Sequence, residues 1–521
     1  MLQQMKRPIA RRLGMGVLAV AGIVGTGAGL AVPSPDPVQG RLTLQWGDPH
    51  PVGMLQAQPA PKLQVVLAAD DGRLYPLDAA QSRRAADDLY ALANRRVAVA
   101  FAPGKRMRQG ARIEHVPDAI IPLDSQPPAK AGELKGNTRW VTVMCKFADI
   151  TTEQKNLAFF NNQYGNAVGQ LGHYWNEVSY GQIDLAGSTA HGWFLLPQPR
   201  SAYVTMVDGK PDADLAKLSQ DCATAADAQV DFNGVQGVNM MFNGDLDGYA
   251  WGGSSCPTVE GSQRCMRLTW NPPWSFNNLA PLAHEMGHGY GLAHSDNSDG
   301  DSDVYDNPWD VMSDAWHNAM NDGTYGARPK HINMHQRDRL GWVDASRKLV
   351  VPAGTAGIWK VDLQYASLAA AGGRQLVMLT MPAQNAAGAN HYTLESRQRS
   401  GDYEGALAGN AVIIHRVNGT MAYSQDASVP PATLSNNEGS MFKPGESWIA
   451  PDGAYRVQID AATPQGFQVT IMAGQLTGGD QPALPGSSTR VAPAAQAAPV
   501  PAFRRSPATR RPPRLDARPV R

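Results

Sequence analysis

Three histidines and a glutamate lie close together in the segment AHEMGHGYGLAHS, residues 283–295. His284 and His288 are four positions apart, so on an α-helix their imidazoles leave from the same face. Gly291 stands where a helix can end on a residue with positive φ, after which the chain can turn back and bring His294 to the same point. Three imidazoles fit a tetrahedral zinc ion whose fourth position is open to water. The spacing therefore predicts a catalytic zinc site with His284, His288 and His294 as ligands.

Glu285 directly follows the first of these histidines and falls close to the face that they share. A carboxylate there fits a general base for the bound water, whose pKa the metal lowers to roughly 7. The alternative is a surface helix that is rich in histidine and glycine by chance. The chain has only 12 histidines, so a chance occurrence of the extended pattern H-E-x-x-H-x-x-G-x-x-H is very improbable. We therefore predict a metal site with Glu285 as its catalytic residue.

The extended pattern resembles that of the metzincin metalloproteases. Metzincins also have a methionine turn beneath the metal, and the segment YDNPWDVMS provides Met312, eighteen residues after His294. This segment, the preceding GLAHS and the following HINMHQRDRLGWV are similar to the gametolysin family and its bacterial relatives, and so are residues 173–197 upstream. The resemblance covers roughly residues 138–345. Asp314 stands where some metzincins have a tyrosine as an extra zinc ligand, so no tyrosine ligand is expected here.

The resemblance implies a mixed α+β fold, in which a metzincin-type catalytic domain is built from a twisted sheet and the zinc-binding helix. It implies a zinc-dependent metalloendopeptidase with one catalytic Zn²⁺, Glu285 as general base, Met312 in a structural role, and peptide or protein substrates. In metzincins an edge strand above the cleft pairs with the substrate backbone. The segment GYAWGG, residues 248–253, is the candidate for this strand, and the alternative is an ordinary loop.

Two other functions stay open at this point. One is a zinc amidase that acts on cell-wall peptide. The other is a non-enzymatic adhesion or carbohydrate-binding protein whose protease domain is vestigial. The presence of Glu285 together with all three histidines argues against the second function, because loss of catalysis usually erodes that glutamate first.

The N-terminus predicts export. Lys6, Arg7, Arg11 and Arg12 precede an uncharged apolar run at residues 13–32, which ends in small residues as a signal peptide does. The alternative is a retained membrane anchor, which the many glycines of the run and the prolines directly after it disfavour. We expect a secreted or periplasmic protein that is monomeric and has no stable membrane insertion after signal cleavage.

Charge and cysteine content narrow the class of protein further. Lysine plus arginine and aspartate plus glutamate both number 46, so the net charge is zero and nothing indicates a nucleic-acid partner. Export places the four cysteines in an oxidising compartment, where they allow three pairings. Cys256 and Cys265 close a short loop just before the zinc helix, which favours the disulfides Cys256–Cys265 and Cys145–Cys222. No cysteine precedes Cys145, which excludes a cysteine switch of the matrix-metalloprotease kind in the N-terminal region.

At 521 residues the chain is too long for one ordinary domain. Short alternating runs after residue 346 are typical of a β-sandwich, and the C-terminal end is too rich in proline, alanine and arginine to bury a core. The region before the catalytic domain is either a removed pro-region, with processing sites at Arg83-Arg84 and Arg95-Arg96, or a small accessory domain that remains attached. The expected division is a signal peptide (1–31), this pro-region or accessory domain (32–135), a metzincin-like zinc protease domain (136–345), a β-sandwich-like domain (346–475) and a disordered tail (476–521).

An acidic loop, SDNSDGDSDVYDN at residues 295–307, follows the third histidine. Its carboxylates repel one another at this density, and a Ca²⁺ ion with about six to eight oxygen ligands would relieve the repulsion. The alternative is a solvated loop in which Asp, Asn, Ser and Gly form turns, and the spacing does not match an EF-hand. The sequence therefore leaves two possibilities open, a calcium site or a solvated loop. The aspartates concerned are Asp296, Asp299, Asp301, Asp303 and Asp306.

Overall fold

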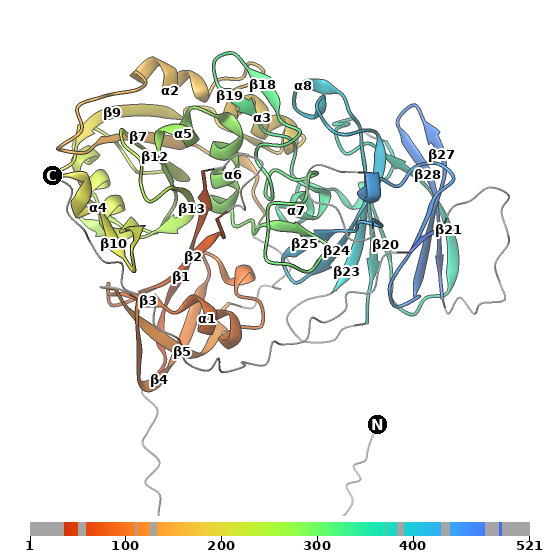
Figure 1. Cartoon of the computed structure of the whole chain (residues 1–521), viewed down its shortest axis with the longest axis horizontal. Helices are drawn as coiled ribbons and strands as arrows, with labels where there is room; N and C mark the ends of the chain where they lie inside the picture. The colour runs from red at the N-terminus through yellow and green to blue at the C-terminus, as the bar shows by residue number, and fades with distance from the viewer. Residues whose placement is uncertain are drawn as a thin grey trace, which may run out of the picture. The chain divides into compact units, whose positions relative to one another are not determined.

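Figure 1 shows the computed structural model of the protein, which describes residues 36–50, 59–109, 112–124, 133–370, 372–382, 390–428, 438–474 and 489–491. Helices and many strands are both present, which confirms the mixed α+β class. The predicted signal peptide lies outside the described residues. Among the described residues, no helix combines the length and the apolar character that a membrane crossing requires.

One ten-stranded sheet packs against the helix of the histidine segment, and its strand order is β2-β3-β5-β4-β1-β13-β16-β12-β7-β9. On one side of β13 (Tyr249–Ser255) lie β16 (Met266–Asn271), β12 (Gly237–Phe242), β7 (Trp140–Lys146) and β9 (Thr189–Leu195). These four strands are parallel to one another, and β13 is antiparallel to β16. Parallel strands are usually covered on both faces, which explains why β7 and β12 are buried along nearly their whole length.

Helices cover both faces of these parallel strands (Figure 1). The side chains of β7 alternate between two cores, with Trp140 and Met144 in the first and Val141 and Val143 in the second. The first core includes side chains of α2 (Leu157–Gln163), α3 (Leu171–Val178), α5 (Pro273–Phe276) and α6 (Leu279–Gly289), and the second includes side chains of α4 (Leu215–Ala226).

Two disulfides are present, with the pairing that the short loop favours. Cys145 of β7 is bonded to Cys222 of α4, which ties this helix to the sheet on the face opposite α6. Cys256 is bonded to Cys265, which closes the loop between β13 and β16. The described residues contain no free cysteine.

Residues 38–122 form the other part of the large sheet and have a hydrophobic core of their own. Strand β1 (Val38–Pro49) pairs with β4 and β2, and through Gln45–Pro49 with β13. The segment expected as an edge strand is therefore a strand, β13, but β1 pairs with its outer edge. Both basic pairs considered as processing sites lie within this folded part, in α1 and at the start of β4. Its other elements are β2 (Lys62–Ala69), β3 (Leu74–Leu77), α1 (Ala79–Ala85), η1 (Tyr90–Leu92), β4 (Arg96–Gln109) and β5 (Arg112–Pro122).

Two further sheets follow, with strand orders β17-β25-β24-β23-β22-β20 and β21-β28-β27-β26-β29. Side chains from both sheets, such as Leu394 and Val469, share one hydrophobic core. Strand β17 directly follows His294, so the histidine segment continues into the first of these sheets. Within the predicted tail, β29 pairs with β26, and the rest of that tail lies outside the described residues.

The strands of these two sheets are β17 (Ser295–Asn297), β20 (Lys348–Val351), β21 (Gly357–Gln364), β22 (Leu376–Thr380), β23 (His391–Arg397), β24 (Ala411–Asn418), β25 (Met421–Ser424), β26 (Ser447–Ile449), β27 (Tyr455–Thr463), β28 (Gly466–Ala473) and β29 (Thr489–Val491). The remaining helices and strands are β6 (Gly136–Asn137), β8 (Ile183–Asp184), β10 (Val204–Val207), β11 (Lys210–Ala213), β14 (Thr258–Val259), β15 (Ser262–Gln263), β18 (Met320–Asp322), β19 (Gly326–Arg328), α7 (Met334–Arg339), α8 (Gly401–Glu404) and the 3-10 helices η2 (Arg200–Ala202), η3 (Ala345–Arg347) and η4 (Glu438–Ser440).

The two disulfides should stabilise the fold unequally. Cys145–Cys222 spans 77 residues and Cys256–Cys265 spans 9, and a longer closed loop removes more entropy from the unfolded chain. We expect the free energy of unfolding to fall by about 4.5 kcal/mol when the first pair is replaced by alanine and by about 2.5 kcal/mol for the second pair. Urea unfolding of the two double variants measures this difference. Equal losses would contradict the loop-entropy explanation.

Candidate metal centre

Helix α6 contains the first two histidines and is buried along its whole length. The glycine between them permits close packing, because a Cβ at Gly287 would lie only 2.3 Å from the Sδ atom of Met312. The helix ends before Tyr290, and Gly291 has a φ of 87°, which glycine adopts without a Cβ clash. This turn brings His294 back toward the helix.

The three imidazoles meet at their Nε2 atoms. Nε2 of His288 lies 3.0 Å from that of His284 and 3.2 Å from that of His294. Nδ1 of His284 lies 2.6 Å from the carbonyl oxygen of Val311, and Nδ1 of His288 lies 2.8 Å from that of Leu292. A carbonyl only accepts, so both Nδ1 atoms carry the proton and both Nε2 atoms present lone pairs to each other. Lone pairs at this distance repel unless a cation lies between them, so these residues fit a metal ion.

A fourth side chain, Asp48 of β1, reaches the same point. One of its carboxylate oxygens lies 2.8 Å from Nε2 of His294, and the other lies 3.3 Å from Nε2 of His284 and 3.4 Å from that of His288. One ligand atom from each of these four buried residues lies within 4.8 Å of the others. We call Asp48, His284, His288 and His294 the metal centre. The sequence pattern did not indicate Asp48, because nothing local distinguishes it and 246 residues separate it from His294.

Glu285 lies beside the metal centre and is only 1% exposed. Apart from the carboxylate of Asp48, neither of its oxygens has a hydrogen-bond partner among the described residues. Strand β13 packs closely against it, since a Cβ at Gly252 would lie 2.4 Å from the backbone oxygen of Glu285. Burial, and then the charge of Asp48, raise the pKa of Glu285 well above its usual range. The carboxylate of Glu285 therefore faces Asp48 and the metal centre rather than solvent.

Burial and charge act in opposite directions on the metal-centre residues. Burial alone would raise the pKa of Asp48, but His294 and His284 outweigh it and hold that pKa well below its usual range. Burial would lower the pKa of His284, yet Asp48 outweighs burial and raises it. For His288 burial prevails and lowers the pKa to about 3. His288 is thus neutral at pH 7, which is the form in which an imidazole binds a metal.

The loop of residues 305–313 packs against α6 and contacts the metal centre. Met312 is fully buried and packs against Gly287 of the helix. The neighbouring residue, Val311, provides the carbonyl that orients His284. One short loop therefore both packs beneath the helix and fixes one imidazole.

A tyrosine from the same loop also reaches the metal centre. The hydroxyl of Tyr305 donates to the Asp48 carboxylate over 2.7 Å, and its ring packs edge-on against that of His294. Asp314, at the position where some metzincins have a tyrosine, instead lies 3.4 Å from the ammonium group of Lys330. The sequence pattern missed Tyr305, because it precedes the methionine of the turn rather than follows it.

The acidic loop gathers three of its five aspartates. Ligand atoms of Asp299, Asp301 and Asp306 lie within 4.8 Å of one another. Asp306 is fully buried, and burial followed by the nearby carboxylate of Asp296 raises its pKa to about 10. Burial also raises the pKa of Asp296, to about 6. A divalent cation would stabilise the charged form of these carboxylates.

More than half of the chain matches a known family. The sequence profile of the gametolysin peptidase M11 family matches residues 141–434. The matched range includes the three histidines, Glu285 and Met312 and extends into the C-terminal sheets, whereas Asp48 lies outside it. No curated protein and no solved structure matches the chain significantly.

Removal of one imidazole should release the metal. In His294→Ala two histidine ligands remain, and we expect zinc retention after dialysis to fall at least about tenfold because each lost ligand weakens the site. Elemental analysis of the purified protein measures the zinc content. His173→Ala, which changes a half-buried histidine of α3 outside the metal centre, is the matched control and should retain zinc. Full zinc occupancy in His294→Ala would show that the ligand assignment is wrong.

Proposed function

The chain belongs to the gametolysin peptidase M11 family, and from this premise we propose that it is a secreted, zinc-dependent metalloendopeptidase of the metzincin type. Membership of the family supports a peptidase and favours a metallopeptidase. The observation that carries the finer proposal is the convergence of three Nε2 atoms beside the buried carboxylate of Glu285. Carbonyl groups hold two of the imidazoles in the orientation that metal binding needs.

His284, His288 and His294 would hold the zinc ion, which when bound polarises the scissile carbonyl and makes water a stronger nucleophile at neutral pH. Glu285 accepts the proton of the attacking water and delivers it to the leaving amine. Met312 acts only as packing beneath α6. Tyr305 offers a hydroxyl donor next to the same point, where negative charge develops on the carbonyl oxygen during hydrolysis.

The rest of the chain supports this function in three ways. Strand β13 lies against Glu285 and is the proposed partner for the backbone of an extended peptide substrate. Two disulfides suit an oxidising compartment and therefore secretion. The two C-terminal sheets, which share one core, are proposed to form a β-sandwich that braces the loop of residues 305–313.

Glu285→Gln should separate the enzyme from a binding protein. Glutamine keeps the size of the side chain but cannot accept the proton, and a positioned general base contributes typically about 10²–10⁴-fold. We expect hydrolysis of a peptide library to fall at least about a hundredfold while zinc content stays at the wild-type level. The wild type and Glu285→Gln are each assayed alone and in combination with the substitution Asp48→Ala, because Asp48 lies at the metal centre.

The same assay decides between the proposed function and its rivals. A zinc amidase would release fragments from peptidoglycan but not from casein, and an adhesion protein would hydrolyse neither. If the wild type cleaves peptides and Glu285→Gln cleaves them equally well, the role of Glu285 is wrong although the zinc site stands.

We also propose that the acidic loop binds calcium through Asp299, Asp301 and Asp306. The gathering of their ligand atoms and the complete burial of Asp306 support this proposal. The loop directly follows His294 and ends at the segment that contains Tyr305, so an ion here would hold both in place.

Calcium should therefore raise the melting temperature of the protein. An ion present at about 100 times its Kd adds about 2.7 kcal/mol to the free energy of unfolding, which corresponds to a shift of several degrees. Calorimetry with calcium, and with magnesium for comparison, measures the shift. Asp306→Asn should abolish it, and Asp245→Asn, an exposed aspartate elsewhere, should not. An unchanged melt of the wild type would leave the solvated loop as the correct interpretation.

A further inference from the structure

Strand β1 occupies the edge of β13 that an extended peptide would use. Gln45–Pro49 pairs antiparallel with Tyr249–Gly253, and the backbone N–H of His50 donates to the carbonyl of Gly248 over 2.9 Å. The other edge of β13 is already paired with β16. Since a peptide can add to a sheet only along a free edge, β1 and an extended substrate compete for the same hydrogen bonds (Figure 1).

The two strands approach each other more closely than most side chains would allow. A Cβ at Gly253 of β13 would lie 2.0 Å from the carbonyl oxygen of Leu44. A Cβ at Gly47 of β1 would lie 2.8 Å from the ring of Trp251, which is itself fully buried. Each strand thus has a glycine where the other needs space, so the pairing depends on the sequences of both.

The side chains of β1 cover the metal centre. The indole of Trp46 stacks on the imidazole of His288, with ring centroids 4.7 Å apart and planes 5° from parallel. Two positions further on, the carboxylate of Asp48 lies within 3.4 Å of all three Nε2 atoms and accepts a hydrogen bond from the hydroxyl of Tyr305. Asp48 is only 7% exposed. A carboxylate oxygen is an ordinary fourth ligand for zinc bound to histidines, and a site with four protein ligands has no open position.

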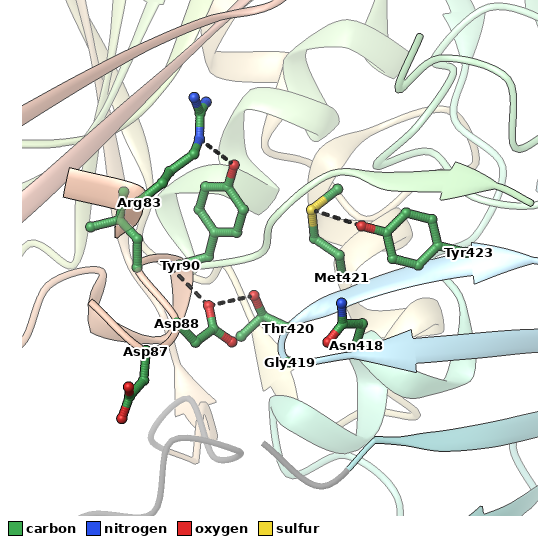
Figure 2. A pocket seen from close by; sticks show the side chains of 10 residues that line it. Arg83, Asp87, Asp88, Tyr90, Asn418, Gly419, Thr420, Met421 and Tyr423 are labelled. Atoms are coloured by element: carbon green, nitrogen blue, oxygen red, sulfur yellow. Dashed lines mark hydrogen bonds between the residues drawn. The ribbon is translucent and has the colours of Figure 1, made fainter. Parts of the chain in front are cut away.

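A second contact holds the N-terminal part against the turn between β24 and β25. The hydroxyl of Thr420 donates to Asp88 over 3.3 Å, and a Cβ at Gly419 would lie 2.5 Å from a carboxylate oxygen of Asp88. Figure 2 shows these side chains along a pocket of about 210 Å³ between this turn and the residues around η1. Strand β1 is therefore part of a folded domain that contacts the rest of the chain away from the metal centre as well.

We propose that residues 38–122 are a built-in inhibitor, in which β1 fills the peptide-binding edge and Asp48 closes the metal centre as its fourth ligand. The inference rests on the proposed function and adds its regulation. The full chain is then latent, and removal of β1 from β13 frees the edge of the sheet and the fourth position of the metal together. The region contains no cysteine, so a thiol cannot be the ligand that closes the metal centre. The carboxylate of Asp48 has that role instead.

Binding of acetohydroxamic acid, a small zinc ligand, tests whether the fourth position is closed. The full chain is prepared with zinc in the Glu285→Gln background, so that it cannot cleave itself, and affinity is measured by calorimetry. Asp48→Ala removes the carboxylate, and Gly47→Val independently forces β1 away from Trp251. Asp118→Ala, an exposed aspartate of the same domain, is the matched control. We expect binding at least tenfold tighter in the first two variants than in the control and the parent protein.

A second readout uses the chain with Glu285 intact. Asp48→Ala should hydrolyse peptides at least tenfold faster than the wild type and Asp118→Ala. Equal hydroxamate affinity in all four proteins of the Glu285→Gln background would overturn the inference, even if the protein proves to be a peptidase. A different outcome separates the two proposals. If hydroxamate binds more tightly to Asp48→Ala and Gly47→Val but no protein that retains Glu285 hydrolyses peptides, the closure of the metal centre is supported and the proposed function is rejected.

Discussion

Two backbone carbonyl groups orient the imidazoles on which the metal centre depends. Val311 accepts from Nδ1 of His284, and Leu292 accepts from Nδ1 of His288. These bonds fix the tautomers, and so they aim the lone pairs of Nε2 at one point. Leu292 lies in the turn after α6, but Val311 lies in a loop that follows the acidic segment. The metal centre is therefore only as well ordered as that loop.

The loop is held by residues on both sides of the expected domain boundary at 345. The side chain of Asp310 accepts from Ser295 and Asn333, and the backbone oxygen of Trp309 accepts from Arg397 of β23 over 2.5 Å. Arg397 in turn forms fully buried ion pairs with Glu395 and Glu404. Removing one partner of such a network leaves an uncompensated buried charge, which is strongly destabilising. This dependence agrees with a family match that continues to residue 434.

The position of β1 has a simple physical reason. An unpaired strand edge exposes backbone N–H and C=O groups and readily accepts another strand. Without β1, the outer edge of β13 would have that character, next to the buried histidines of α6. A segment of the same chain that pairs with the edge and places a carboxylate beside the three histidines provides partners for both the backbone groups and the imidazoles.

The features that the sequence by itself determined are local. The spacing of His284 and His288 specifies one helix face, Gly291 permits the turn that follows, and the short separation of Cys256 and Cys265 favours their disulfide. Each depends on geometry within a few residues, which the order of amino acids defines directly. The tertiary structure alone decided the rest, including the place of Asp48. That carboxylate reaches His294 only because β1 pairs with β13 in one register, a contact across 246 residues. A strand pattern predicts that a segment is extended, but it does not say which edge the segment will join, because every edge offers the same backbone groups.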